Sequence, residues 1–344
     1  MKRHLKHIVI VIVITILLVQ FENLIEASLG NSTIRIIYDK YGAPMVDYGY
    51  QYGVYIGKVW NPLIVAEHAI NYFNMYNATH DEKFKLKFLH CVSILLNLSE
   101  DRGDYLVFLY NFPWPYPKYQ INGPWISCMS QSASVVVLAL AYKVTNNATF
   151  LQLANKALKA FEIPVEEGGL AYKVDDGLWY EEYAYPRSKV RPYVLNGFMY
   201  SLIRLYEYWK LTRSEKALEL FNKGIRALKL MIHKFDLEYW TAYDLLGTIA
   251  RLPKHELHIR FSKKLYEITG DELFKKYHIK WSGYIFTPYG LRELISWHAL
   301  KLFRELLVLD TMSKFLVNLA MAFFVYIVIR YLIKAVKLTL RLIY

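Results

Sequence analysis

The sequence predicts an all-α fold, an α/α toroid (barrel) of about four helical hairpins with small β-hairpin insertions. A recurring turn indicates the hairpins, because each copy places Asp, Asn or Ser two residues after a Thr, where a side-chain oxygen can cap the next helix. Its copies are Thr79-His80-Asp81, Thr145-Asn146-Asn147, Thr212-Arg213-Ser214 and Thr269-Gly270-Asp271. Apolar residues after the third copy advance by three and four and so line one helix face: Leu218, Phe221, Ile225, Leu228 and Ile232.

Helices that repeat in pairs without long linkers favour closure around one core, which is the reason for expecting a toroid. An open superhelix of the same hairpins is the alternative. Two segments interrupt the helical pattern. Residues 34–60 are rich in Tyr, Gly, Ile and Val and predict strands and loops, and residues 168–183 predict a β-hairpin with its turn at 175–177.

Apolar segments near both ends predict membrane attachment. Residues 8–19 form an unbroken apolar run after Lys2, Arg3 and Lys6, the pattern of a signal peptide or of an uncleaved anchor. Residues 315–329 are apolar apart from Asn318, which predicts a transmembrane helix once flanking residues are included. The expected organisation is therefore a signal peptide or anchor (1–27), a β/loop segment (28–62), the helical domain (63–310), a C-terminal transmembrane helix (313–335) and a basic tail (336–344).

Charge sets the expected orientation and partners. Four cations follow the second apolar segment, so the tail is expected in the cytoplasm and the main domain outside it, at the cell surface or in a lumen: Arg330, Lys334, Lys337 and Arg341. Four N-glycosylation sequons are compatible with this placement: Asn31, Asn77, Asn97 and Asn147. The net charge of +12 suits an anionic glycan or a membrane surface, and the lack of a Lys/Arg run argues against nucleic acid.

The two cysteines, Cys91 and Cys128, leave a disulfide and two buried thiols as open alternatives. Neither has metal-site spacing. His255 and His258 are three residues apart and would share a helix face, but no third metal ligand is evident. The sequence therefore predicts no metal and no cofactor.

Five segments occur in an order that resembles a known family. They read Pro-Trp-Ile-Ser-Cys-Met-Ser-Gln at 124–131, Leu-Trp-Tyr-Glu-Glu-Tyr at 178–183, Val-Leu-Asn-Gly-Phe-Met-Tyr-Ser-Leu at 194–202, Tyr-Asp-Leu at 243–245 and His-Glu-Leu-His-Ile at 255–259. Together they resemble the C-terminal domain of the D-glucuronyl C5-epimerase family over roughly residues 36 to 310. The resemblance implies an α/α barrel and epimerisation at C5 of glucuronic acid units.

This chemistry requires two proton carriers and neutralisation of the substrate carboxylate as the enediolate forms. On an extended strand Glu181 and Glu182 point to opposite faces, so only one of them can face a cleft. The resemblance selects Glu182 as a proton carrier. The alternative is a solvated hairpin with one Glu paired to Arg187 or Arg191.

Tyr243 matches the tyrosine of the family's site. The alternative role for this residue is packing of its aromatic side chain on a helix end. Two departures fall close to it. The family commonly has a tyrosine directly before the first histidine of the His-Glu-Leu-His-Ile motif, and this chain has Lys254 there. The family also commonly has an arginine directly after Tyr-Asp-Leu, and this chain has Leu246. Lys254 is therefore the third candidate catalytic residue, and Arg251 is a candidate substitute cation.

The remaining candidate substrate contacts follow from the same resemblance, since carbohydrate sites combine flat aromatic faces with amide hydrogen bonds. For each of them core packing or capping is the alternative. The set is Trp125, Gln131, Tyr180, Tyr183, Arg187, Asn196, Arg251, His255 and His258.

The function expected from these observations is C5 epimerisation of glucuronic acid units in an extracytosolic, heparan sulfate-like glycan or other polysaccharide by a membrane-anchored glycoprotein. A uronate lyase, which starts with the same proton abstraction, is one alternative. A catalytically silent glycan-binding or cell-surface protein is the other, and the departures at Lys254 and Leu246 favour it. A homodimer remains open, because the chain lacks the β-rich region that precedes the helical domain in longer family members.

Overall fold

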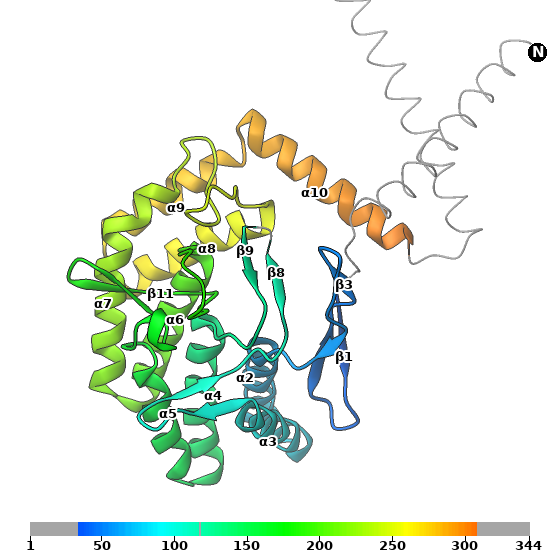
Figure 1. Cartoon of the computed structure of the whole chain (residues 1–344), viewed down its shortest axis with the longest axis vertical. Coiled ribbons are helices and arrows are strands. Elements are labelled where there is room, and N and C mark those ends of the chain that lie inside the picture. Colours follow the sequence, from blue (N-terminus) through cyan, green and yellow to red (C-terminus); the bar gives the residue numbers. More distant parts are fainter. Residues whose placement is uncertain (1–33, 117, 308–344) are drawn as a thin grey trace, which may run out of the picture. The chain divides into compact units, whose positions relative to one another are not determined.

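The computed structural model describes residues 34–116 and 118–307 (Figure 1). It divides into two compact units, residues 32–293 and a second unit of which residues 294–307 are described. These last residues are the C-terminal part of helix α10 (Pro288–Leu307). The apolar run at 8–19 and the transmembrane helix expected at 313–335 lie outside the described residues.

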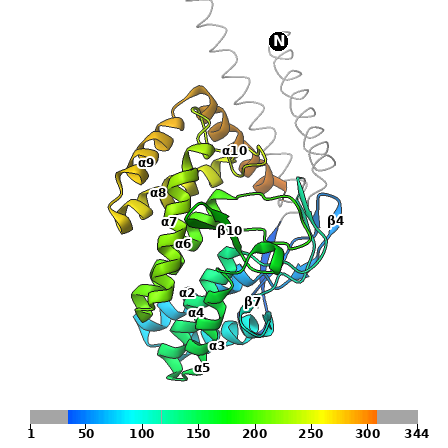
Figure 2. The ribbon, with the colours of Figure 1, turned by 60° about the vertical axis from the view of Figure 1, so that its left-hand side comes forward.

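Four helical hairpins make up most of the first unit, as Figures 1 and 2 show. They are α2 (Pro62–Thr79) with α3 (Glu82–Asn97), α4 (Cys128–Thr145) with α5 (Thr149–Lys159), α6 (Leu195–Thr212) with α7 (Glu215–Met231), and α8 (Leu252–Thr269) with α9 (Glu272–Tyr284). The first helices of the hairpins pack in the order α2, α4, α6, α8, and each second helix packs on its own partner. Within the described residues, α2 and α8 share no extensive interface.

The recurring Thr closes each first helix and starts the turn. The hydroxyl of Thr79 donates to the carbonyl of Met75 at 2.7 Å and accepts the backbone N–H of Asp81 at 3.3 Å. The other three copies make the same pair of bonds. The residue after the Thr adopts the left-handed backbone conformation in every copy, and this conformation ends the helix. The hairpins are therefore built by one repeated local device.

Three of the four expected caps are confirmed. Asp81, Ser214 and Asp271 are the N-cap residues of α3, α7 and α9, and their side chains accept backbone N–H groups of the first turn. The fourth is wrong by one position, because the N-cap of α5 is Ala148. Asn147 still accepts the backbone N–H of Thr149 at 3.0 Å, so its side chain braces the turn from just outside the helix.

Short antiparallel strands fill the segments between helices. β1 (Arg35–Tyr38), β2 (Pro44–Asp47) and β5 (Lys58–Val59) form a sheet in the order β1-β2-β5. The remaining strands form two-stranded hairpins: β3 (Tyr50–Gln51) with β4 (Val54–Tyr55), β6 (Ser99–Asp101) with β7 (Leu106–Phe108), β8 (Trp114–Tyr116) with β9 (Tyr119–Ile121), and β10 (Ala171–Val174) with β11 (Gly177–Tyr180). Two 3-10 turns, η1 (Val165–Glu167) and η2 (Ile232–Phe235), complete the described elements.

The β10–β11 hairpin has a tighter turn than the sequence indicates. Val174 pairs with Gly177, so the turn consists of Asp175 and Asp176 alone, and Asp175 takes the left-handed conformation such turns require. The strand ends at Tyr180, which leaves the two glutamates that follow in a turn after the strand. Their environments are therefore set by that turn and not by strand alternation.

α4 lies at the centre of the helical row, between α2 and α6 and against α5. It is the one helix in the described part of the chain that is long and apolar enough to cross a membrane, and 72% of it is buried inside the protein. Its apolar character is that of a core helix. Cys91 and Cys128 are both buried free thiols, which answers the question left open by the sequence.

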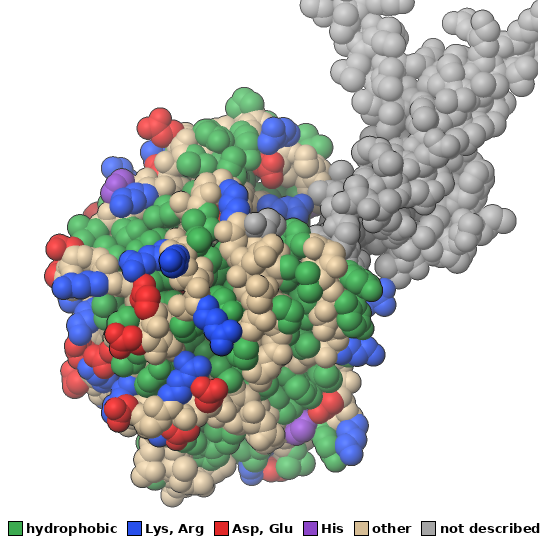
Figure 3. Space-filling view, viewed as in Figure 1, with side chains coloured by type: hydrophobic (Ala, Val, Ile, Leu, Met, Phe, Trp, Pro, Cys, Tyr) green, Lys and Arg blue, Asp and Glu red, His purple; other side chains and the backbone are tan. Residues whose placement is uncertain are grey.

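Charged side chains of both signs are interspersed over the helical part of the face in Figure 3. Partly exposed ion pairs of the helical part include Lys216 with Glu162 and Lys223 with Glu219. Exposed pairs of this kind add little stability.

Candidate functional site

A cavity of about 220 Å³ lies at the N-terminal ends of the first helices of the hairpins. Asn61 and Leu63 at the start of α2, Ser127 and Met129 at the start of α4, and Lys254 in the first turn of α8 line it. The other lining residues are Tyr48, Tyr110, Phe112, Trp114, Trp125, Glu182 and Tyr183. Because helix N-termini carry partial positive charge, these ends favour a negative charge in the cavity.

Glu182 is the acidic residue of this lining and is 7% exposed. The Asn196 side chain, in the first turn of α6, donates to Glu182 Oε2 at 3.1 Å, and the Tyr243 hydroxyl donates to Oε1 at 3.3 Å. Gly197 lies against the same carboxylate, and a Cβ at position 197 would collide with Oε2. The Val-Leu-Asn-Gly motif therefore provides both a donor and the space for Glu182.

Burial raises the pKa of the Glu182 carboxyl, and the Lys254 ammonium together with the donors around it acts against this rise. A carboxyl of this kind can take up and return a proton under mild conditions. Burial and the charge of Glu182 raise the pKa of the Tyr243 phenol well above its ordinary value. At neutral pH Tyr243 is therefore protonated, and it serves as a hydrogen-bond donor to the carboxylate.

Tyrosine hydroxyls extend this network away from Glu182. The Tyr183 and Tyr243 hydroxyls lie 3.0 Å apart, and the Tyr183 ring stacks on Tyr116 with centroids 5.6 Å apart. Tyr116 in turn donates to Asp244 Oδ2 at 2.5 Å. Asp244 accepts the backbone N–H groups of Leu246 and Thr248, so the β8 strand and the loop after Tyr243 are joined at the site.

Lys254 lies close to this group, with Nζ 5.7 Å from the centroid of the Tyr243 ring. Its position in the cavity lining gives the site a cation beside Glu182. Leu246, the other departure from the family pattern, packs among the apolar residues around Tyr243. Its carbonyl accepts Lys118 Nζ at 3.0 Å.

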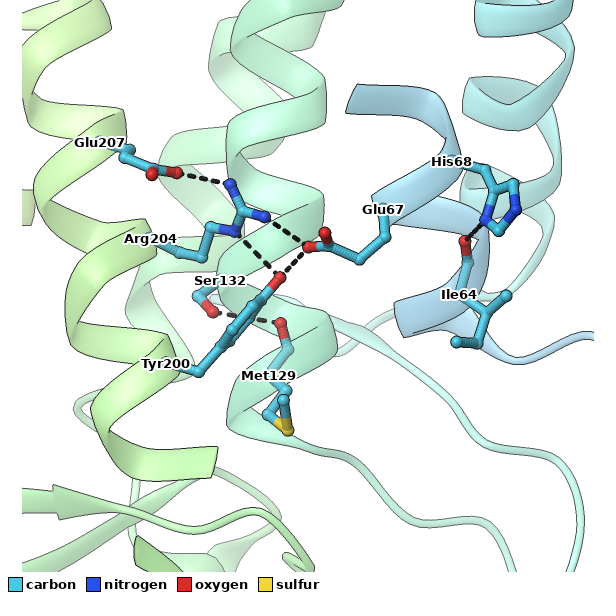
Figure 4. Close-up of polar contacts among 8 residues, drawn as sticks. All are labelled: Ile64, Glu67, His68, Met129, Ser132, Tyr200, Arg204 and Glu207. Carbon is cyan, nitrogen blue, oxygen red and sulfur yellow. Dashed lines mark hydrogen bonds and ion pairs between the residues drawn. The ribbon is translucent and has the colours of Figure 1, made fainter. Parts of the chain in front are cut away.

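A polar network ties α2 to α6 across α4, further along these helices than the residues that line the cavity (Figure 4). Arg204 donates to Glu67 and to Glu207, both at 2.6 Å, and Tyr200 also donates to Glu67. Tyr200 lies one helical turn after Asn196, so the network holds α6 close to the residue that donates to Glu182.

Glu182, Tyr183, Lys254 and Trp125 line one cavity, and Asn196 and Tyr243 contact Glu182. Glu182 and Tyr243, two of the candidate catalytic residues, do not face each other across a gap, because their side chains are hydrogen-bonded to each other. No substrate atom fits between two groups at that distance.

Gln131 and Tyr180 do not reach the cavity. The Gln131 side chain is fully buried and bonds the backbone of Leu106, Phe108 and Ala157, so it ties α4 to β7 and α5. The Tyr180 hydroxyl donates to the carbonyl of Leu220 at 2.7 Å in the packing between β11 and α7. Both are core residues whose polar atoms are satisfied by backbone groups.

His255 and His258 are also fully buried away from the cavity lining. Each ring contacts the Thr241 hydroxyl through Nδ1, at 2.8 and 2.9 Å, and His255 stacks on Trp240 with centroids 3.6 Å apart. The structure does not bring either ring to the cavity, because the helix face that they share packs against the chain before α8 and against α9.

Arg187 and Arg251 are exposed, and neither is among the cavity-lining residues. Arg251 is the N-cap residue of α8, where its carbonyl accepts the backbone N–H groups of Lys254 and His255. Arg191 pairs with Glu166 at 2.6 Å and not with either glutamate of the motif. The cavity lining therefore holds Lys254 and none of these three arginines.

The aromatic wall of the cavity was missed by the sequence analysis. Tyr48, Tyr110, Phe112 and Trp114 come from two segments without a repeat or a matched motif. The one sequence signal is the density of aromatic and proline residues at 110–119.

A larger hollow of about 710 Å³ lies along β10 and β11. Two of the cations in its lining are already paired, Arg191 with Glu166 and Lys223 with Glu219. No residue of the Glu182 group lines this hollow.

The two buried histidines make the fold sensitive to acid. Burial lowers the pKa of His255 to about 4 and that of His258 well below its usual value, so the folded state holds both rings neutral. In the unfolded chain the two histidines bind protons near pH 6.5, so the free energy of unfolding falls as the pH drops below that value.

We expect His258→Asn to lose less unfolding free energy than the wild type between pH 7 and pH 5 in urea denaturation. Equal losses would contradict this.

Comparison with known proteins agrees with this geometry. The chain matches the family model of the D-glucuronyl C5-epimerase C-terminus over residues 102–283. A D-glucuronyl C5-epimerase of Caenorhabditis elegans is 35% identical over 187 residues, which cover 49% of this chain and 29% of that protein. An uncharacterised protein of Methanocaldococcus jannaschii is 32% identical over 258 residues, which cover 69% of this chain and 82% of that protein.

Two solved structures share the fold. A cellobiose 2-epimerase from Bacillus thermoamylovorans has a TM-score of 0.52 at 12% identity, covering 72% of this chain and 66% of its own. A sugar epimerase from a ruminal bacterium has a TM-score of 0.52 at 10% identity, covering 73% and 65%. These likenesses place the mostly helical fold in the α/α-barrel class. With the family model covering more than half of the sequence, including the segments that carry Glu182, Tyr243 and Lys254, the chain belongs to the D-glucuronyl C5-epimerase family.

Proposed function

We propose that the protein epimerises C5 of glucuronic acid units in a glycan. The observation that carries the proposal is the buried Glu182 carboxylate in a cavity with a lysine and the N-terminal ends of helices beside it. Removing the C5 proton of a uronate places a second negative charge on the carboxylate side of the sugar. A water-poor site with preset positive groups stabilises that charge most effectively.

The chemistry divides between two side chains that line the cavity. Glu182 as a carboxylate takes the C5 proton, and the electron pair moves into the substrate carboxylate to form an enediolate. Lys254 as an ammonium neutralises this charge and returns a proton to the opposite face of C5. Glu182 loses its proton and Lys254 regains one by exchange with water before the next turnover, so no redox step and no cofactor is involved.

The aromatic side chains suit a sugar. Tyr48, Phe112, Trp114 and Trp125 offer flat faces to the C–H groups of a pyranose ring, and a volume of about 220 Å³ favours one sugar unit over several. The Tyr243 hydroxyl donates a hydrogen bond to Glu182 Oε1 and so holds the carboxylate in position. In this arrangement Tyr243 is a positioning residue, and the second proton carrier is Lys254.

The first test is exchange of the C5 hydrogen in deuterated water. Wild-type protein incubated with uronate glycans should incorporate deuterium at C5, and Glu182→Gln should stop incorporation with little change in glycan binding, because it removes the proton carrier and keeps the shape. Lys254→Met should also stop it, and Lys254→Tyr, which restores the family's phenol, should retain exchange. Glu256→Gln, an exposed acid on the same helix, is the matched control.

The outcomes separate the candidate functions. A wild-type protein that binds uronate glycans without exchange is a silent binder, and an unsaturated product identifies a lyase. Undiminished exchange in Glu182→Gln would contradict the role of that residue under any of the enzymatic functions.

Gly197 gives a second test that keeps every catalytic side chain chemically unchanged and alters only the position of one of them. Gly197→Ala places a methyl group where the Glu182 carboxylate lies, so the carboxylate must move by about 1 Å. A displacement of that size costs on the order of 10²-fold in rate. We expect deuterium incorporation to fall by this factor while the thermal unfolding temperature stays within a few degrees. Unchanged incorporation would show that Glu182 has room to shift without loss.

We also propose that the protein acts outside the cytoplasm, anchored to a membrane. The proposal rests on the apolar runs at 8–19 and 315–329 and on the cations after residue 329, all in the sequence alone. Protease added to intact cells should digest the domain of residues 34–307 and leave the tail at 336–344 protected. The reverse pattern would invert the orientation.

A further inference from the structure

Glu181, the first glutamate of the pair, has no exposed surface and does not line the cavity. Its Oε1 accepts the backbone N–H of Glu182 at 2.8 Å and that of Tyr183 at 3.3 Å. Its Oε2 accepts the backbone N–H of Tyr193 at 2.8 Å. Both carboxylate oxygens are therefore used, and they bind two separate segments of the chain.

The first segment carries the residues that face the substrate. Glu182 and Tyr183 lie in the turn after β11, where the regular hydrogen bonds of the hairpin have ended. Backbone bonds of Glu181 with Leu170 and Cys128, the Tyr119 hydroxyl bonded to the Tyr183 carbonyl, and the bridge between Ile126 and Ala184 also hold this turn. The N–H groups of Glu182 and Tyr183 are held by the Glu181 side chain. The position of the Glu182 backbone follows from these bonds.

The second segment leads into α6 and holds the other side of the site. Tyr193 has a positive φ of 52°, which is unusual for a bulky residue and is retained when surrounding contacts enforce it. Two residues later the N–H of Leu195 donates to the carbonyl of Tyr243 at 3.1 Å, and Asn196 then donates to Glu182. Fixing Tyr193 therefore fixes both donors that contact the Glu182 carboxylate.

Glu181 is buried as an acid because its carboxylate offers two acceptor oxygens. No ion pair of Glu181 occurs within residues 34–116 and 118–307, so its burial without a cation is costly. A glutamine of the same length would avoid this cost, but it offers one acceptor oxygen and would turn its NH₂ group toward an N–H donor. Only a carboxylate of this length presents acceptors to both segments.

We propose that Glu181 is a second positioning residue of this site. Its two carboxylate oxygens hold the turn of Glu182 and Tyr183 at a fixed distance from the start of α6, so that Glu182, Asn196 and Tyr243 meet. This role in catalysis rests on the proposed epimerase function. The hydrogen bonds themselves can be tested without it.

The kinetic test uses the full chain and two variants. Glu181→Gln should lower kcat for C5 exchange on the order of 10²-fold and change KM by less than about twofold, because the substrate-binding walls stay in place. Glu181→Asp keeps the charge but is one methylene shorter, and it should lose kcat to a similar extent because it cannot reach both segments. The matched control is Glu166→Gln, which removes the neighbouring ion pair with Arg191 and should leave kcat unchanged.

Backbone amide hydrogen exchange gives the second readout. In Glu181→Gln the amide of Tyr193 should exchange at least 10-fold faster than in the wild type, while the amides of α4 keep their protection. Full kcat in Glu181→Asp would show that charge and not geometry matters, and unchanged protection of Tyr193 in Glu181→Gln would also overturn the proposal. If the wild type shows no C5 exchange, the epimerase function fails, and amide exchange alone then decides whether Glu181 positions these segments.

Discussion

The burial of the Glu182 carboxylate at the N-terminal ends of the helices is the constraint on which the site depends. A carboxylate in that position is unfavourable unless donors and a cation surround it. Asn196, Tyr243 and Lys254 meet this requirement from three different parts of the chain. Gly197 leaves the space for it. The same environment that tolerates one buried negative charge is suited to stabilise the charge that develops on a uronate.

The helical scaffold explains how distant segments meet at one cavity. Each hairpin begins near the cavity, runs away along a first helix, turns at a Thr and returns along the second helix. The turn is stabilised within itself, by the Thr hydroxyl and by the residues that follow it. The opposite end is left to irregular segments and short strands. These carry the aromatic wall and the glutamate turn.

The sequence predicted the hairpins and three of their caps because these depend on local periodicity and capping chemistry. It also predicted that Glu182, Tyr183, Lys254 and Trp125 face one site, since the motifs that contain them match a family in order. The same motifs contain Gln131, Tyr180, His255 and His258, which the structure does not bring to the cavity. In a single sequence, a residue that packs in the core looks the same as one that contacts substrate. Polar atoms of these four residues bond backbone or side-chain groups of the protein itself. The aromatic wall could not be predicted, because its members come from separate segments that only the folded chain brings together.

The central claim is that a uronate unit binds with its C5 between Glu182 and Lys254. The most direct measurement is a crystal structure of the Glu182→Gln variant soaked with a short glucuronate-containing oligosaccharide. The account predicts one uronate in the cavity, with the side-chain amide introduced at position 182 within about 3.5 Å of C5 on one face and Lys254 Nζ near the other face and the carboxylate. A uronate bound in the hollow along β10 and β11, or in the cavity with C5 turned away from residue 182, would contradict it.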